Sequence, residues 1–156
     1  MQQKTISRDT PLSEVTLRRY EKPSNLSERE LVRKLCLSIG LLQPGDSRDI
    51  LVDVLYVLLK AKKENKHLTS DEVEKLVIET RKTMKMPLVG IASSNIRRHL
   101  KRLKDIYIID RHADRYRINE NATLSELFDE KIEKFLIPSM TSRIKEYFQK
   151  VDDAFK

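Results

Sequence analysis

The segment from Ile50 to Leu59 constrains the fold more than any other, because its residues are apolar almost all round. A helix of this kind must be covered by neighbouring elements on several sides. At ten residues it is shorter than the roughly 18 apolar residues of a membrane-spanning helix, and Asp53 interrupts it. We therefore expect a central helix from Ser47 to about Lys63, with Asp46 as its cap.

Helix-start signals divide the rest of the chain. Ser27, Thr69 and Thr123 are each followed three residues later by glutamate, the pattern of a capping box. These signals predict helices beginning near 26, 69 and 123, and Pro138 is expected to kink or end the third. We divide the chain into an N-terminal arm (1–25), a helix and turn (26–45), a central domain (46–120) and C-terminal helices (121–156).

Residues 91–105 predict an amphipathic helix with one strongly basic side. At 100° per residue, Ala92, Ile96, Leu100 and Leu103 share one side, whereas arginine and lysine occupy the other. The β-branched run 106–109 then predicts a strand, residues 111–114 a four-residue link, and residues 115–118 a second strand. The expected fold is mainly α with a small β-hairpin, in the order helix, helix, turn, helix, hairpin.

The positive charge is concentrated on this helix and hairpin. Of the net charge of +7, residues 85–118 contribute +6 from nine basic and three acidic residues, whereas residues 46–84 are neutral and residues 119–156 carry −2. Binders of polyanions gather charge where the partner docks. The distribution therefore favours a nucleic-acid partner over a uniformly solvated surface.

The pattern from Ser93 to Leu100, with a small polar start, a branched apolar residue and then basic residues before leucine, resembles the winged helix-turn-helix transcription regulators of prokaryotic and archaeal type. The resemblance covers about 46–118. It departs from the family at Asp105 and Ile106, where many members carry a glycine. It implies a winged helix-turn-helix fold with additional N-terminal and C-terminal helices, helix 91–105 in the major groove of double-stranded DNA and hairpin 106–118 as the wing.

The resemblance also assigns roles to individual residues. Base edges would be read by Ser93, Ser94, Asn95 and Arg98. Phosphates would be contacted by Arg97, Lys101, Arg102, Arg111, Arg115 and Arg117. The expected function is that of a sequence-specific DNA-binding protein and transcriptional regulator.

The last segment places Met140, Ile144, Tyr147, Val151 and Phe155 on one narrow stripe, with Phe148 beside it. Because a short helix is marginal alone in water, this stripe needs a partner. We expect a homodimer through the C-terminal helices, and packing on the N-terminal helix is the competing interpretation. Two other function classes stay open, a winged-helix protein interaction module or a chromosome-associated structural protein; RNA binding is less favoured, because the basic segment offers few stacking aromatics.

Other chemistry is poorly supported by the sequence. The single Cys36 lies between two leucines and is expected to pack as a small hydrophobe. His67 and His112 have no metal-ligand spacing, and His99 is expected to be a half-buried structural residue. We expect no enzyme activity, no metal and no cofactor. Residues 1–10 lack a secretory signal pattern, which favours a cytoplasmic location without membrane contact.

Overall fold

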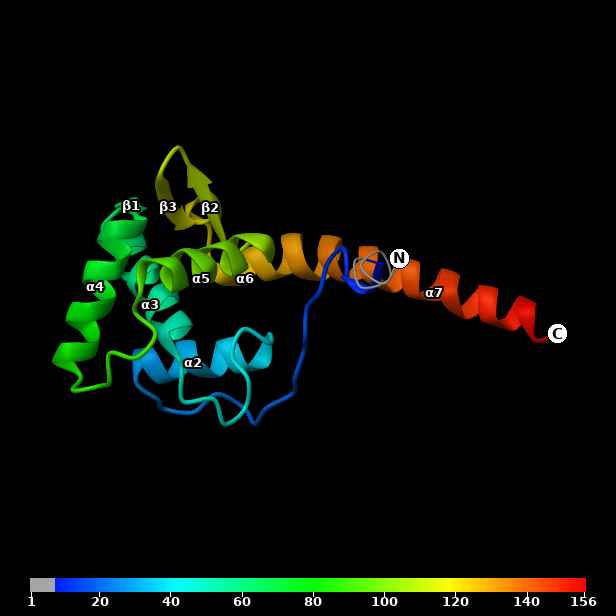
Figure 1. Ribbon diagram of the computed structural model, residues 1–156, viewed down its shortest axis with the longest axis horizontal. Coiled ribbons are helices and arrows are strands. Elements are labelled where there is room, and N and C mark those ends of the chain that lie inside the picture. Colours follow the sequence, from blue (N-terminus) through cyan, green and yellow to red (C-terminus); the bar gives the residue numbers. More distant parts are fainter. Residues whose placement is uncertain (1–7) are drawn as a thin grey trace.

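The computed structural model describes residues 8–156, so residues 1–7 of the predicted arm, and most of the segment searched for a secretory signal, lie outside the described residues. The chain is mainly helical with a small antiparallel sheet, which confirms the coarse prediction (Figure 1). The described elements run in the order α2 (Glu28–Ser38), α3 (Ile50–Lys63), β1 (Leu68–Thr69), α4 (Ser70–Thr83), α5 (Ser93–Asp105), β2 (Ile109–His112), β3 (Arg115–Ile118), a 3-10 helical turn (Asn119–Asn121), α6 (Leu124–Leu127), a π-helical stretch (Phe128–Leu136) and α7 (Ile137–Ala154).

Helix α3 forms the centre of the body, as its apolar sequence predicted. Its residues from Ile50 to Leu58 are all buried, and α2, α4, α5 and β3 contact it. The start of α3 differs from the prediction: the helix begins at Ile50 with Asp49 as N-cap, and Asp49 makes no capping hydrogen bond through its side chain. Asp46 instead accepts a hydrogen bond from the backbone N–H of Arg48, which closes a turn before the helix.

The capping signals place the starts of α4 and α6 correctly. Thr69 with Glu72, and Thr123 with Glu126, form complete capping boxes in which side chain and backbone bond reciprocally. At α2, the Ser27 hydroxyl accepts from the Glu30 N–H. Each bond satisfies one of the N–H groups that a helix start leaves without a partner.

The second strand of the hairpin lies at Arg115–Ile118, as predicted, but the first strand begins three residues later than the sequence predicted. Tyr107 has a φ of 65°, so the chain reverses after α5 and the first strand begins at Ile109 instead of Ile106. The link is the two-residue turn Ala113–Asp114, with Arg111 and His112 inside β2. β3 pairs with β2 on one side and with β1 on the other, so in residues 8–156 the sheet has the order β1-β3-β2. β1 was not predicted, because its two residues carry no periodic pattern.

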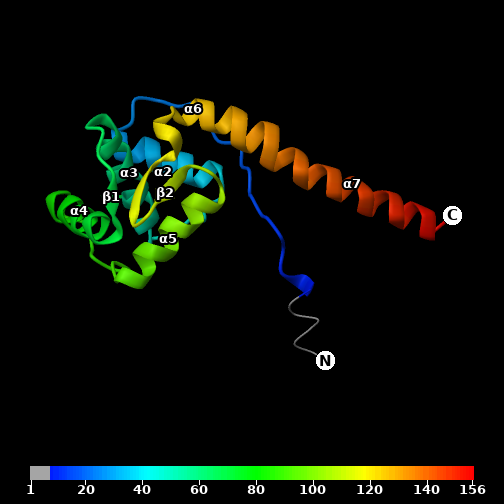
Figure 2. The same ribbon diagram turned by 90° about the horizontal axis from the view of Figure 1, so that it is seen from above.

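The C-terminal region is one continuous helical segment, and the prediction that Pro138 ends a helix is wrong. Ile137 donates its N–H to the Ile132 carbonyl, five residues back, so the turn before Pro138 is wider than an α-helical turn. This wider turn leaves space for the proline ring, and the helix continues to Ala154. α7 projects well away from the body (Figure 2).

The described part of the arm crosses the body beside α2. The Arg18 backbone N–H donates to the Ser38 carbonyl at 2.8 Å, and its guanidinium donates to the carbonyls of Leu37 and Leu42. Among the described residues, no helix is both long and apolar enough to cross a membrane.

Candidate nucleic-acid interface

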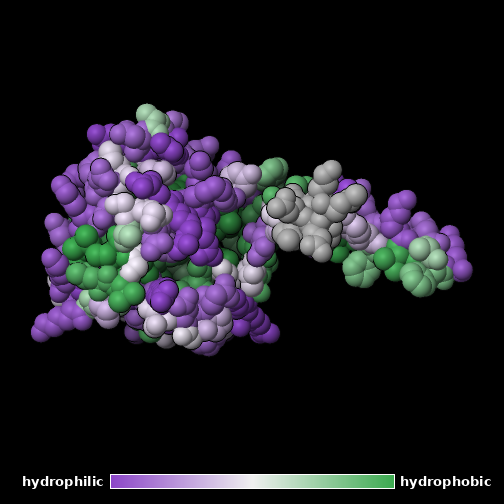
Figure 3. Space-filling view, in the orientation of Figure 1, coloured by the Kyte–Doolittle hydropathy of each residue, from purple (hydrophilic) through white to green (hydrophobic). Residues whose placement is uncertain are grey.

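Helix α5 has the two sides that its sequence predicted. Ile96, Leu100 and Leu103 are fully buried against the body. Arg97, Arg98, Lys101 and Arg102 are exposed. Ala92 is an exception: it was predicted on the packed side but is the exposed N-cap residue. Figure 3 shows hydrophilic side chains gathered over the middle of the body, where α5 runs in Figure 1.

The four residues predicted to read bases differ in their exposure and in their hydrogen-bond partners. Ser94 is exposed, whereas Ser93 is half-buried and donates its hydroxyl to the Glu74 carboxylate of α4 at 2.9 Å. Arg98 donates to the Asn95 side-chain oxygen at 2.9 Å. Asn95 and Arg98 therefore form one pair on the solvent side, and Ser93 belongs to the contact between α4 and α5.

The basic residues further along α5 also differ in their side-chain partners. In the described part of the chain, Arg97 makes no side-chain hydrogen bond or ion pair. Lys101 pairs with Asp105 at 2.9 Å, one turn further on. Arg102 donates to the Gly40 carbonyl at 3.3 Å and so points toward the loop after α2. Of Arg97, Arg98, Lys101 and Arg102, Arg97 is therefore the one without a side-chain partner in the described part of the chain.

The three arginines of the hairpin have separate surroundings. Arg117 is half-buried and makes two hydrogen bonds to Asp110, of 3.0 and 3.2 Å. Burial alone would raise the pKa of Asp110, but the bonds from Arg117 and from the Glu120 N–H hold that pKa below its ordinary value. Arg117 is therefore committed within the sheet, and it is less suited to phosphate contact than the sequence indicated.

Arg111 and Arg115 remain on the exposed surface. The Arg111 guanidinium lies over the Tyr116 ring, 5.5 Å from its centroid. Arg115 donates to the His67 carbonyl at 3.3 Å and lies 3.7 Å from Glu72. Because both contacts are at the solvent, either side chain can exchange them for a phosphate at small cost.

A buried ion cluster joins α2, α3 and α4 and reaches the loop before α5, and it was not predicted from the sequence. Asp53 is fully buried in α3 and accepts from Arg29 of α2 at 2.8 and 3.0 Å and from Arg81 of α4 at 2.6 Å. Asp49 accepts from the same two arginines. Arg81 also donates to the Pro87 carbonyl, in the loop that leads into α5. The available signal was Asp53 itself, since a charge inside an apolar helix requires partners.

His99 is half-buried at the edge of α5, as predicted. Its Nδ1 atom is buried without a hydrogen-bond partner in the described structure. Burial first, and then the positive charges of Arg98 and Arg102, lower the pKa of His99 to about 4. The ring is therefore neutral at pH 7. Cys36 is fully buried, and burial raises its pKa to about 12, so its thiol is unreactive.

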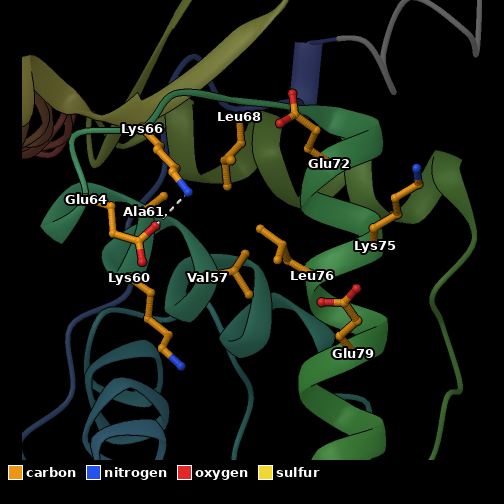
Figure 4. Close-up of a pocket in the computed structure, with 10 residues that line it drawn as sticks. All are labelled: Val57, Lys60, Ala61, Glu64, Lys66, Leu68, Glu72, Lys75, Leu76 and Glu79. Atoms are coloured by element: carbon orange, nitrogen blue, oxygen red, sulfur yellow. Dashed lines mark ion pairs between the residues drawn. The ribbon is translucent and has the colours of Figure 1, made fainter.

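A pocket lies between α3 and α4. Figure 4 shows its apolar floor of Val57, Leu68 and Leu76 beneath a rim of alternating lysine and glutamate side chains. Its volume is about 470 Å³, and an ion pair between Lys66 and Glu64 crosses one edge. Within residues 8–156, no group of three histidine, cysteine or acidic side chains is placed to hold a metal ion.

No family model, curated protein or solved structure matches this chain.

Proposed function

We propose that this protein is a sequence-specific double-stranded DNA-binding protein of the winged helix-turn-helix class and acts as a transcriptional regulator. In this proposal α5 enters the major groove, and the hairpin β2–β3 lies along the DNA backbone as the wing. Such a protein would work in the cytoplasm.

The observation that carries the proposal is the solvent side of α5, where Ser94, Arg97 and Arg98 are exposed and the half-buried Asn95 bonds Arg98, opposite a fully buried apolar side. Asparagine and arginine are the side chains that bond adenine and guanine bidentately. The order helix, strand, helix, helix, hairpin adds support, because it sets a three-stranded sheet beside the end of α5.

The contacts of single side chains support a narrower set of proposed roles. We assign base contact to Ser94, Asn95 and Arg98, since the Asn95–Arg98 bond lies at the solvent and can be exchanged for base edges. Phosphate contact is assigned first to Arg97 and next to Arg111 and Arg115. The ion pair of Arg117 with Asp110 gives this arginine a mainly structural role, holding the two wing strands together.

A test follows from Arg98. Arg98→Ala should weaken binding to a selected duplex by roughly 1–3 kcal/mol and relax the base preference at one position, because an arginine bidentate to guanine is lost. Lys63→Ala is the matched control, since Lys63 is an exposed cation at the end of α3, outside both α5 and α7. Site selection from a random duplex pool, followed by mobility-shift titration, gives both quantities. Equal loss for the two variants would contradict the assignment.

We also propose that the protein is a homodimer through α7. None of the residues of α7 is buried in the single chain, and beyond Met140, which packs on the core, the side chains of its apolar stripe are exposed. The competing interpretation, packing on the N-terminal helix, finds no support, because α7 projects away from α2 (Figures 1 and 2). A two-fold protein would read paired half-sites.

The second candidate function is a winged-helix protein interaction module. The pocket between α3 and α4 favours it, because Leu76 is 36% exposed at its floor and the rim carries both signs of charge. Leu76→Asp would abolish the binding of a protein partner and leave duplex binding unchanged. Pull-down with and without nuclease distinguishes the two functions.

A further inference from the structure

The apolar stripe of α7 is exposed along its whole free length. Ile144 and Val151 are 51% and 56% exposed, and Tyr147 and Phe155 are 69% and 85% exposed. Figure 3 shows hydrophobic surface on the projecting helix, away from the body. A contiguous apolar surface of this kind marks an interface.

The direction of the stripe limits what can cover it. At 100° per residue, Leu136, Met140, Ile144, Tyr147 and Val151 fall within about 80° of one another around the helix. Leu136 is buried against the body and Met140 packs on the core. One side of the helix therefore packs against the body before Met140, and the same side is exposed to solvent beyond Met140.

We propose that α7 beyond Met140 pairs antiparallel with α7 of a second copy, and that Phe155 of each copy enters a pocket at the body of the other. This inference rests on the homodimer part of the proposed function. A parallel pair is excluded by the direction of the stripe. Each body lies on the side that faces the partner, so two parallel helices 8–10 Å apart would bring both bodies into the same space. In the antiparallel pair the bodies lie at opposite ends.

One register matches every member of the stripe. When Ile144 lies opposite Tyr147 of the partner subunit, Met140 lies opposite Val151 of the partner subunit, and Leu136 lies opposite Phe155 of the partner subunit. These pairs follow the 4-3-4 spacing of residues 140, 144, 147 and 151, which is the heptad spacing of paired helices. The neighbouring Arg143 is already paired with Glu146 of its own helix, which reduces repulsion along the seam.

The last pair of this register, Leu136 with Phe155 of the partner subunit, lies beside a cavity. A pocket of about 620 Å³ lies where the arm, the end of α5 and the start of α7 meet, and Leu136 forms part of its wall. Leu12, Ile106 and Tyr107 add apolar surface, and Leu12 is 97% exposed in the single chain. Phe155 of the partner subunit arrives at Leu136 and has an aromatic side chain to fill this space.

The buried area fits a stable pair. Five side chains from each copy, at roughly 100–150 Å² each, would bury about 1,000–1,500 Å² in total, close to the size of specific interfaces. The unreactive, buried Cys36 makes the arrangement testable by introduced cysteines.

The experiment mixes two full-length variants, Met140→Cys and Val151→Cys, under mild oxidation. The antiparallel register predicts a disulfide-linked dimer in the mixture and none when either variant is oxidised alone, because like positions lie about 16 Å apart along the axis. The unchanged chain is the control for Cys36. Ile137→Cys with Ala154→Cys gives a second pair in the same register, should Met140→Cys disturb folding.

The outcomes separate this inference from the proposed function. Cross-linking of either variant with itself would indicate a parallel pair, and a monomeric mass by light scattering would show that no dimer forms. Either result would overturn the inference. Duplex binding measured on the same samples tests the DNA function independently. Phe155→Ala should raise the dimer dissociation constant roughly tenfold or more, as for an anchor residue. Lys156→Ala is its matched control and should leave that constant unchanged. Equal effects of these two variants would refute the pocket contact.

Discussion

The buried ion cluster gives the most quantitative prediction. Asp53→Ala removes a carboxylate that is 0% exposed and accepts three hydrogen bonds from Arg29 and Arg81, at 2.8, 3.0 and 2.6 Å. The variant leaves the two buried guanidinium groups sharing Asp49 as their one buried carboxylate, with Glu30 at 3.7 Å from Arg29 and the Pro87 carbonyl bonded to Arg81. Removing one member of a buried ion pair costs about 3–5 kcal/mol, mainly because the remaining charge is desolvated without a partner.

The measurement is the free energy of unfolding from urea titration followed by circular dichroism. At about 2–4 °C per kcal/mol for a chain of this size, the melting temperature should also fall by roughly 10 °C. Asp46→Ala is the matched control, since Asp46 is exposed and makes one local bond to a backbone N–H. The control should lose about 1 kcal/mol or less.

The cluster has a second, positional consequence. Because Arg81 joins Asp53 to the Pro87 carbonyl, the variant should also weaken duplex binding at temperatures where it remains folded. An Asp53→Ala protein as stable as the Asp46→Ala control would refute the reasoning, because the three bonds would then contribute no net stability.

Two further predictions concern stability. Gly40→Ala should cost about 1–3 kcal/mol in urea unfolding, because Gly40 has a φ of +74° and an added Cβ would lie 2.5 Å from the Thr16 Cβ of the arm. Gly45→Ala has the same backbone strain at +79° without any atom within 4 Å, so a loss at Gly45 as large as that at Gly40 would contradict the packing argument. The free energy of unfolding should also fall as the pH drops from 6.5 to 4, because His99 takes up a proton in the unfolded chain but, with its pKa of about 4, not in the folded one. The expected loss is about 1–2 kcal/mol for a half-buried ring. His99→Gln should remove this part of the pH dependence.

The sequence predicted those features that local chemistry determines. Thr69 and Thr123 could be identified as helix starts because a capping box is complete within four residues. The buried side of α5 could be predicted because Ile96, Leu100 and Leu103 repeat at helical spacing. Periodic and capping signals are local, so they are readable without knowledge of the rest of the fold.

The features that the sequence did not predict depend on residues far apart or on the backbone. The ion cluster joins Arg29, Asp53 and Arg81 across three helices, so no local pattern contains it. Tyr107 takes a positive φ that delays the first strand, and a β-branched run cannot reveal this. Pro138 is tolerated because of a π-helical stretch, which no residue preference marks.

The candidate nucleic-acid interface was likewise predicted in its local features and not in its long-range contacts. The basic character of α5 and the hairpin was evident from charge counts, and the exposure of Arg97 and Arg98 agrees with it. The differences between individual side chains were not evident. Ser93 bonds Glu74 and Arg117 bonds Asp110. A charge count includes both carboxylates but does not show which side chains they bind.

The most direct test of the central claim is the affinity of the protein for duplex DNA as a function of salt concentration. The account predicts binding whose logarithm falls linearly with the logarithm of salt concentration, with a slope of about −0.9 for each phosphate contacted. Arg97→Ala should reduce the magnitude of that slope by about one. The absence of duplex binding at moderate salt, or a salt slope that Arg97→Ala leaves unchanged, would contradict the assignment of α5 as the DNA-binding helix.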